Sequence, residues 1–320
     1  MLIQILLLLV GLAMVVFGAD YLVEGASSVA RRFGLSEFVI GLTIVGMGTS
    51  APEMVVSFIG AAQGNSDIAM GNVVGSNIFN TLLILGITAL ILPVAVTHSN
   101  KKIDIPVNIA ITFLLIVLGL EHSLFGLGTE DGLSQIDGAI LLACFVAYIA
   151  ASFRKKENTD PAPSNTVPSR KVWLASLMIA GGLVALVVGG RLFVDSATYI
   201  ARALNVSDKF IAITILAGGT SMPELATCIA AAVKKKGQLA LGNIIGSNVF
   251  NILLILGGSA LIHPISFNNI NYVDLAALMV SSLVLLTGCY VGKKNELDRL
   301  DGSLFLLLWV SYMVYLSVNL

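Results

Sequence analysis

Charge is scarce in this 320-residue sequence: only 12% of the residues are Asp, Glu, Lys or Arg, whereas 57% are hydrophobic. The mean hydropathy of +0.93 is far above the value of a soluble globular domain. Because a chain inside lipid must satisfy its backbone groups within its own segments, long apolar runs predict helices. The sequence therefore predicts an all-α polytopic membrane protein.

The net charge and the small number of cysteines each argue against a class of function. The net charge is −1, so no basic face is available to neutralise nucleic-acid phosphates. Only three cysteines are present, Cys144, Cys228 and Cys289, and all lie in apolar segments, which argues against a disulfide framework or a zinc site. We therefore expect no nucleic-acid partner and no cofactor, and no obligate protein partner is evident.

Ten apolar segments are each close to the length of about 20 residues that a helix needs to cross a bilayer. They cover approximately 2–24, 38–62, 68–92, 105–120, 136–153, 172–195, 208–233, 239–262, 273–291 and 303–319. A polar stretch with three prolines, 154–171, divides them five and five. We therefore expect a first five-helix repeat over 1–153, a linker over 154–171 and a second five-helix repeat over 172–320.

Two halves with an odd number of helices enter the membrane in opposite orientations, which is the inverted-repeat plan of many secondary transporters. If the amino terminus is outside, the inner loops hold fifteen of the 18 Lys and Arg residues, and only Arg191, Arg202 and Lys209 lie outside. This bias follows the positive-inside rule. We expect a protein of the cell membrane (plasma or inner membrane), with both termini outside and a cytoplasmic linker.

The strongest feature of the sequence is a pair of motifs that occurs once in each half. The segment 48–53 reads GTSAPE and 219–224 reads GTSMPE, while 71–80 reads GNVVGSNIFN and 242–251 reads GNIIGSNVFN. Equivalent positions in both motifs are 171 residues apart, as Glu53 and Glu224 are. A constant offset over both motifs indicates duplication of one structural unit.

Glu53 and Glu224 are the only acidic residues near the middle of a predicted span. An ionisable group at this depth is costly without a partner, so it predicts a functional site. Pro52 and Pro223 lack an amide hydrogen and should break each helix beside its glutamate, which makes backbone carbonyls available.

Uncharged oxygen donors accompany both acids. Thr49, Ser50, Thr220 and Ser221 lie three or four residues before a glutamate, a helical spacing that brings hydroxyls close to the carboxylates. Ser76 shares a helix face with Asn80, as Ser247 does with Asn251. A donor set without histidine or thiolate suits calcium and sodium better than magnesium or a transition metal. No role is assigned to four further asparagines of the motifs: Asn72, Asn77, Asn243 and Asn248.

With these motifs, the chain resembles the calcium/cation antiporter superfamily, and most closely the prokaryotic sodium/calcium exchangers. The resemblance implies ten helices, ion sites between helices 2, 3, 7 and 8, and gating by sliding of helices 1 and 6. It implies as ligands Glu53, Thr49, Ser50, Ser76 and Asn80 in the first half and Glu224, Thr220, Ser221, Ser247 and Asn251 in the second. Backbone oxygens of Gly46 and Ala217 occupy further matching positions.

One departure from the pattern leaves the coupling ion open. Several relatives carry aspartate where this chain has Asn80 or Asn251, so the site here has two carboxylates. The expected function is a secondary antiporter that exchanges sodium for calcium by alternating access within the bilayer. The alternatives are a proton/calcium antiporter and a potassium-dependent sodium/calcium antiporter. A passive cation channel is a weaker alternative, and an enzyme is not expected because the motifs contain no evident nucleophile.

Overall fold

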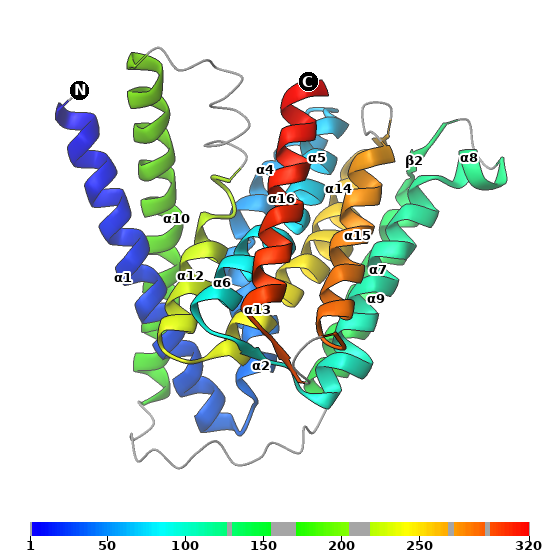
Figure 1. Cartoon of the computed structure of the whole chain (residues 1–320). Coiled ribbons are helices and arrows are strands. Elements are labelled where there is room, and N and C mark those ends of the chain that lie inside the picture. The colour runs from blue at the N-terminus through cyan, green and yellow to red at the C-terminus, as the bar shows by residue number, and fades with distance from the viewer. Residues whose placement is uncertain are drawn as a thin grey trace.

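Nearly all of the described chain is helical (Figure 1), as the composition predicts. The computed structural model describes residues 2–126, 130–154, 171–204, 218–267, 272–291 and 295–319. Most of the predicted linker 154–171 therefore lies outside the described residues, as do the first ten residues of the predicted seventh span, 208–217.

The first half contains long helices that are interrupted by short π-helical segments (η). Its elements are α1 (Leu2–Phe33), α2 (Glu37–Ile40), η1 (Gly41–Val45), α3 (Gly46–Thr49), α4 (Ala51–Ala62), α5 (Ser66–Ile78), η2 (Phe79–Ile84), α6 (Leu85–Ile91), β1 (Val94–Ala95), η3 (Asn100–Asp104), α7 (Ile105–Gly119), α8 (Glu121–Phe125), β2 (Gly132–Leu133) and α9 (Gln135–Arg154).

The second half repeats this order. Its described elements are α10 (Val172–Ala203), α12 (Met222–Val233), α13 (Gly237–Phe250), η5 (Asn251–Leu256), α14 (Gly257–Ile262), β3 (Ile265–Ser266), α15 (Tyr272–Gly288), β4 (Glu296–Leu297) and α16 (Arg299–Asn319). The π-helical segment η2 begins at Phe79, and η5 begins at Asn251, which is the equivalent of Asn80, so the two segments are offset by one residue in the repeat.

Each predicted membrane span contains an observed helix, which for the seventh span is described only over Met222–Val233. Within the described residues, seven helices are long and apolar enough to cross a membrane, one further span is the bent pair 37–49 and 51–62, and α12 and α15 are shorter apolar helices. The helices α1 and α10 have 32 residues each and extend beyond the predicted ends at 24 and 195. A helix of that length is about 48 Å long, which exceeds the hydrocarbon core of about 30 Å, so these helices also traverse the interfacial layers.

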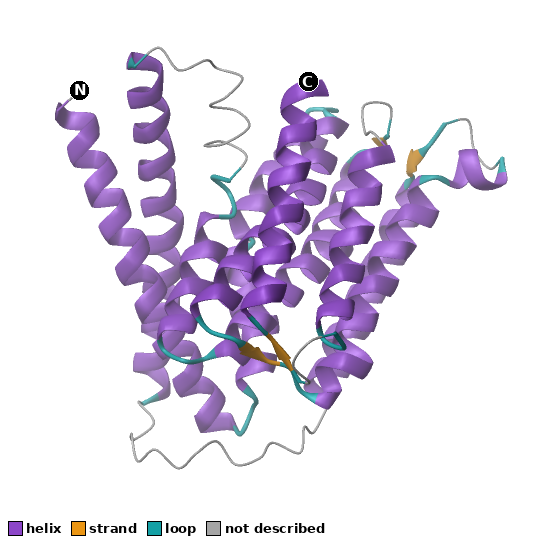
Figure 2. Ribbon diagram, in the orientation of Figure 1, coloured by secondary structure: helices purple, strands orange, loops and turns teal. Residues whose placement is uncertain are grey.

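The chain ends and the strands follow the inverted repeat. The first residues of α1 and the last residues of α16 lie at one end of the bundle, whereas α9 ends and α10 begins at the opposite end (Figure 1). Strand β1 pairs antiparallel with β4 from the other half, and β2 pairs antiparallel with β3 (Figure 2). Because β1 and β3 are equivalent in the repeat, the two pairs are exchanged by the same pseudo-two-fold relation.

The helix α13 lies at the centre of the bundle and belongs to the span Gly237–Ile262, whose most apolar window is 94% buried. It packs against α2 and η1 through glycines that allow backbones to touch. A Cβ atom at Gly242 would lie 2.2 Å from the Phe38 carbonyl oxygen, and one at Gly246 would lie 2.1 Å from the Leu42 carbonyl oxygen. Close approach through small residues is typical of helix pairs in lipid, and here it holds the two motif-bearing regions together.

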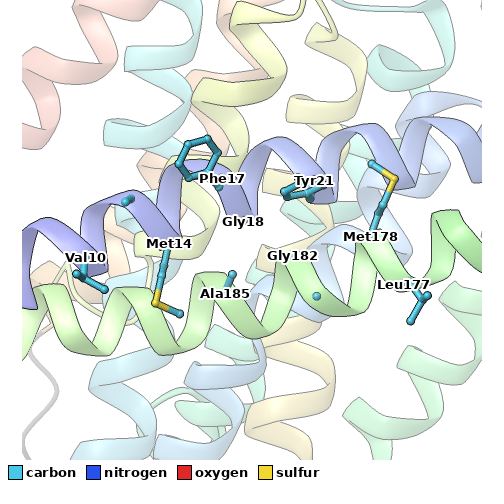
Figure 3. Close-up of a pocket in the computed structure, with 11 residues that line it drawn as sticks. Val10, Met14, Phe17, Gly18, Tyr21, Leu177, Met178, Gly182 and Ala185 are labelled. Atoms are coloured by element: carbon cyan, nitrogen blue, oxygen red, sulfur yellow. The ribbon is translucent and has the colours of Figure 1, made fainter.

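The antiparallel pair α1 and α10 lies at the edge of the bundle (Figure 1). Gly11 and Gly18 lie seven residues apart and contact Gly189 and Gly182 respectively, which gives the seam a coiled-coil spacing. An apolar groove of about 570 Å³ runs along this pair, lined by side chains such as Val10, Met14 and Leu177 (Figure 3). Its lining contains no charged residue, so it has no cation-binding chemistry.

Gly246→Ala should destabilise the protein, because the added methyl group overlaps the Leu42 carbonyl and must separate α13 from η1. Overpacking of this kind typically costs about 1–3 kcal/mol. The expected result is a lower melting temperature of the detergent-solubilised protein. The matched control is Gly181→Ala in α10, where a Cβ atom meets nothing within 4 Å. Equal melting temperatures for the two variants would show that the α13 contact is not tight.

Candidate cation-binding site

The two glutamates lie in the first turns of equivalent helices, α4 and α12. The helix pair 37–49 and 51–62 is bent by 47° at Ser50, which has φ −81° and ψ 7°. Ser221 has nearly the same conformation, φ −86° and ψ 10°, at the start of α12. In both cases proline is in the first turn of the following helix and glutamate comes next. The break that Pro52 predicts is therefore present in the first half, and Ser221 has the matching conformation in the second half, where residues 205–217 lie outside the described residues.

Both glutamate side chains are buried, with Glu53 1% and Glu224 0% exposed. The Ser50 hydroxyl donates to Glu224 Oε1 at 2.9 Å, and the Ser221 hydroxyl donates to Glu53 Oε1 at 3.1 Å. Each serine thus contacts the glutamate of the other half and not the one three residues ahead, which differs from the expectation based on helical spacing. Ser50 and Ser221 are the N-cap residues of α4 and α12, and their backbone angles differ from those of a regular helix, so helical spacing does not fix the direction of their side chains.

The threonines of the first motif are bonded to asparagines of the second motif in the opposite half. Thr49 donates to Asn243 Oδ1 at 3.2 Å, and Asn243 Nδ2 in turn donates to Cys228 Sγ at 3.3 Å. In the other half, the Thr220 hydroxyl lies 3.5 Å from Asn72 Oδ1, and Asn72 Nδ2 donates to Ser57 Oγ at 3.0 Å.

These contacts give roles to Asn72 and Asn243, to which the sequence assigns none. The only signal in the sequence is that each recurs at the offset of 171 residues, together with the equivalent pair Ser57 and Cys228.

Serine and backbone oxygens extend the cluster around Glu224. The Ser247 hydroxyl lies 3.4 Å from Glu224 Oε1 and 3.3 Å from the Gly46 carbonyl oxygen. Ser76, the equivalent of Ser247, is buried on α5. The equivalent of Gly46 is Ala217, which lies outside the described residues.

Asn80 and Asn251 lie in the π-helical segments η2 and η5, and both are buried. Asn80 Nδ2 donates to Asn248 Oδ1 at 3.3 Å, and Asn251 Nδ2 donates to Asn77 Oδ1 at 2.9 Å. Both bonds run between the halves. A π-helical turn inside a long helix is frequent at functional sites because it redirects individual side chains.

Four buried oxygens of this cluster have no hydrogen-bond partner within the described residues: Glu53 Oε2, Glu224 Oε2, Asn80 Oδ1 and Asn251 Oδ1. They form two repeat-equivalent pairs. Buried polar atoms almost always have a partner, so four symmetric exceptions point to a ligand.

The chemistry of the cluster is that of a hard-cation site. Within the described residues, neither Glu53 nor Glu224 forms an ion pair, and no group of three or more His, Cys, Asp and Glu side chains is present. Two carboxylates with surrounding amide, hydroxyl and carbonyl oxygens suit calcium or sodium, whereas nitrogen- and sulfur-binding transition metals find no matching donor set.

Comparisons with known proteins identify the family of this chain. A family model described as sodium/calcium exchanger protein matches residues 3–154 and 174–318. The sodium/calcium exchanger MaX1 of Methanosarcina acetivorans is 32% identical, over 98% of this chain and 98% of its own length. The inner membrane protein YrbG of Escherichia coli is 33% identical, over 99% of this chain and 98% of its own length.

A solved structure of the sodium-calcium exchanger NCX_Mj, obtained from protein soaked with Na⁺ and Sr²⁺, matches the fold with a TM-score of 0.83. The match has 34% sequence identity and covers 98% of both chains. The chain thus belongs to the sodium/calcium exchanger family, whose members are membrane ion exchangers and not enzymes.

Proposed function

We propose that this protein exchanges sodium for calcium across the cell membrane by alternating access, with the ions held at mid-membrane between the two halves. The ligands are the carboxylates of Glu53 and Glu224, the side chains of Thr49, Ser50, Ser76, Asn80, Thr220, Ser221, Ser247 and Asn251, and the backbone oxygens of Gly46 and Ala217. The observation that carries this proposal is the set of four buried, unpartnered oxygens on Glu53, Glu224, Asn80 and Asn251.

Charge supports calcium and sodium as the transported ions. Two carboxylates balance one calcium ion or two sodium ions, so either load leaves the site nearly neutral at a depth where net charge is costly. Calcium accepts six to eight oxygen ligands in flexible geometry, which a mixed set of carboxylate, amide and hydroxyl oxygens can supply. Magnesium demands near-ideal octahedral geometry and sheds its water reluctantly, which disfavours it here.

The inverted repeat supports alternating access over a passive channel. Two equivalent hydrogen bonds join the halves: Ser50 of the first half donates to Glu224 of the second, and Ser221 of the second half donates to Glu53 of the first. A site built from two equivalent halves can open to either side by the same motion in reverse. A channel would need a continuous polar path, whereas this site is enclosed by buried residues.

The oxygen ligands of the site favour sodium as the counter-ion. Sodium fits the neutral oxygens, which can share the coordination of two ions with the carboxylates. Protons would use the carboxylates alone and leave the amide oxygens of Asn80 and Asn251 without a role. For this reason we favour sodium over protons as the counter-ion.

We further propose that residues 1–153 and 172–320 are the two inverted repeats and that 154–171 forms a cytoplasmic linker. Both termini then face outside. The distribution of Lys and Arg supports this orientation. The bilayer and the transported ions are the only partners that this function requires.

Glu53→Gln and Glu224→Gln should each lower calcium uptake by reconstituted liposomes by about tenfold or more, because calcium at the site loses an anionic ligand. Neither change alters side-chain volume, so the elution volume of the purified protein should be unchanged. Glu121→Gln, which changes a partly exposed acid on α8, is the matched control and should transport normally. Near-normal uptake by both site variants would remove Glu53 and Glu224 from the ligand set.

The orientation has its own test, in which single cysteines replace Ser164 in the linker and Asn319 at the end of α16. Cys144, Cys228 and Cys289 are first replaced by alanine. An impermeant maleimide applied to intact cells should modify the cysteine at 319 and leave the cysteine at 164 unmodified until the membrane is permeabilised. Labelling of both positions from the same side is incompatible with five helices in each half.

A further inference from the structure

Asn77 and Asn248 are repeat-equivalent asparagines that are 1% and 2% exposed and lie outside the proposed ligand set. We propose that they are positioning residues, which turn the amide oxygens of Asn251 and Asn80 toward the bound cation. This inference rests on the proposed cation site. It goes beyond the ligand set because it explains how two neutral asparagines can act as reliable oxygen ligands.

An asparagine ligand has an intrinsic ambiguity. Its amide carries an oxygen that attracts a cation and an NH2 group of nearly the same shape that repels it. Rotation of the amide by half a turn exchanges the two with little change in packing. A partner that accepts a hydrogen bond from Nδ2 removes the ambiguity, because the oxygen must then face the other way.

Two chains of hydrogen bonds, here called relays, fix these amides. The first relay begins at a backbone carbonyl. Asn77 Nδ2 donates to the carbonyl oxygen of Asn248 at 3.1 Å. A carbonyl cannot donate, so the amide of Asn77 keeps its oxygen on the opposite side, where it accepts from Asn251 Nδ2 at 2.9 Å. Inversion of this relay would place Asn77 Oδ1 against another acceptor. Asn251 Oδ1, which has no partner within the described residues, is therefore locked in one orientation.

The second relay begins at a hydroxyl. Asn248 Nδ2 donates to Thr81 Oγ1 at 2.8 Å, and Asn248 Oδ1 accepts from Asn80 Nδ2 at 3.3 Å. A hydroxyl can donate or accept. Rotation of the Thr81 hydroxyl therefore allows the whole relay to invert, which turns Asn80 Nδ2 toward the site. The residue equivalent to Thr81 in the second half is Ile252, so the relay that ends on a hydroxyl exists in one half only.

The two halves therefore differ in one specific respect. Asn251 is a fixed oxygen ligand, whereas the orientation of Asn80 depends on Asn248 and Thr81. When Asn80 presents its oxygen, the site gains a ligand that calcium needs for its coordination of six to eight oxygens. The geometry thus assigns Asn80 as the adjustable ligand and Asn251 as the constant one.

The test is a pair of mutant cycles on calcium uptake by proteoliposomes, with KM and maximal rate measured separately. Asn77→Ala should raise the calcium KM by about tenfold, since loss of a residue that orients a ligand typically costs about 10–100-fold in affinity. The same change should add less than about twofold in an Asn251→Ala background, because Asn77 then has no ligand to orient. In an Asn80→Ala background Asn77→Ala should keep its full effect on the calcium KM, because Asn251 is still present. This double variant is the matched control.

Equal effects of Asn77→Ala in all three backgrounds would overturn the positioning role, because a purely structural residue acts independently of either ligand. Failure of the proposed cation site looks different: Asn251→Ala and Asn80→Ala would then leave the calcium KM unchanged in the otherwise native chain. The two outcomes are therefore distinguishable.

A shape-preserving variant covers the case in which Asn77→Ala does not fold. Thr81→Val should raise the calcium KM about threefold, since Asn248 loses the hydrogen bond that holds its amide in place beside Asn80. This effect should vanish in the Asn80→Ala background. Thr88→Val is the control, because Thr88 is equally buried on the same span and its hydroxyl donates to the Ile84 carbonyl at 2.7 Å, away from the relay. Indistinguishable KM values for Thr81→Val and Thr88→Val would refute the relay through Thr81.

Discussion

The burial of two carboxylates at the centre of a membrane domain is the constraint on which the rest of this structure depends. An ionised carboxylate in such surroundings costs several kcal/mol unless an opposite charge and hydrogen bonds compensate for it. Serine hydroxyls from the opposite half satisfy one oxygen of each glutamate, and the second oxygens of Glu53 and Glu224 have no partner within the described residues. This arrangement stabilises the acids only in part, and we propose that a transported cation supplies the remaining compensation.

Backbone geometry places these groups. The non-helical conformations of Ser50 and Ser221 place polar groups at the starts of α4 and α12, and the π-helical segments carry Asn80 and Asn251. Glycines such as Gly246 let α13 touch η1. Irregular backbone at membrane depth is tolerated only where protein or a polar cavity surrounds it. The glycine contacts supply this enclosure, so the tight core and the polar site are consequences of one requirement.

Much of this fold follows from the sequence, because hydropathy, charge bias and an internal repeat are local signals. They predict the spans, the breaks at Pro52 and Pro223, and the residues that cluster around the glutamates. The partners of these residues are not local. Helical spacing pairs Ser50 with Glu53, whereas the structure pairs it with Glu224, and nothing in the pattern around Asn77 indicates that it faces Asn251. Contacts between the halves depend on tertiary packing, which periodicity does not encode.

Counter-ion dependence of calcium movement tests the central claim most directly. Purified protein in liposomes loaded with sodium is diluted into sodium-free buffer that contains radioactive calcium, with potassium and pH equal on both sides. The account predicts calcium uptake that stops when a sodium ionophore dissipates the gradient. Calcium entry without any counter-ion gradient would indicate a channel, and uptake driven only by a proton gradient would contradict sodium exchange.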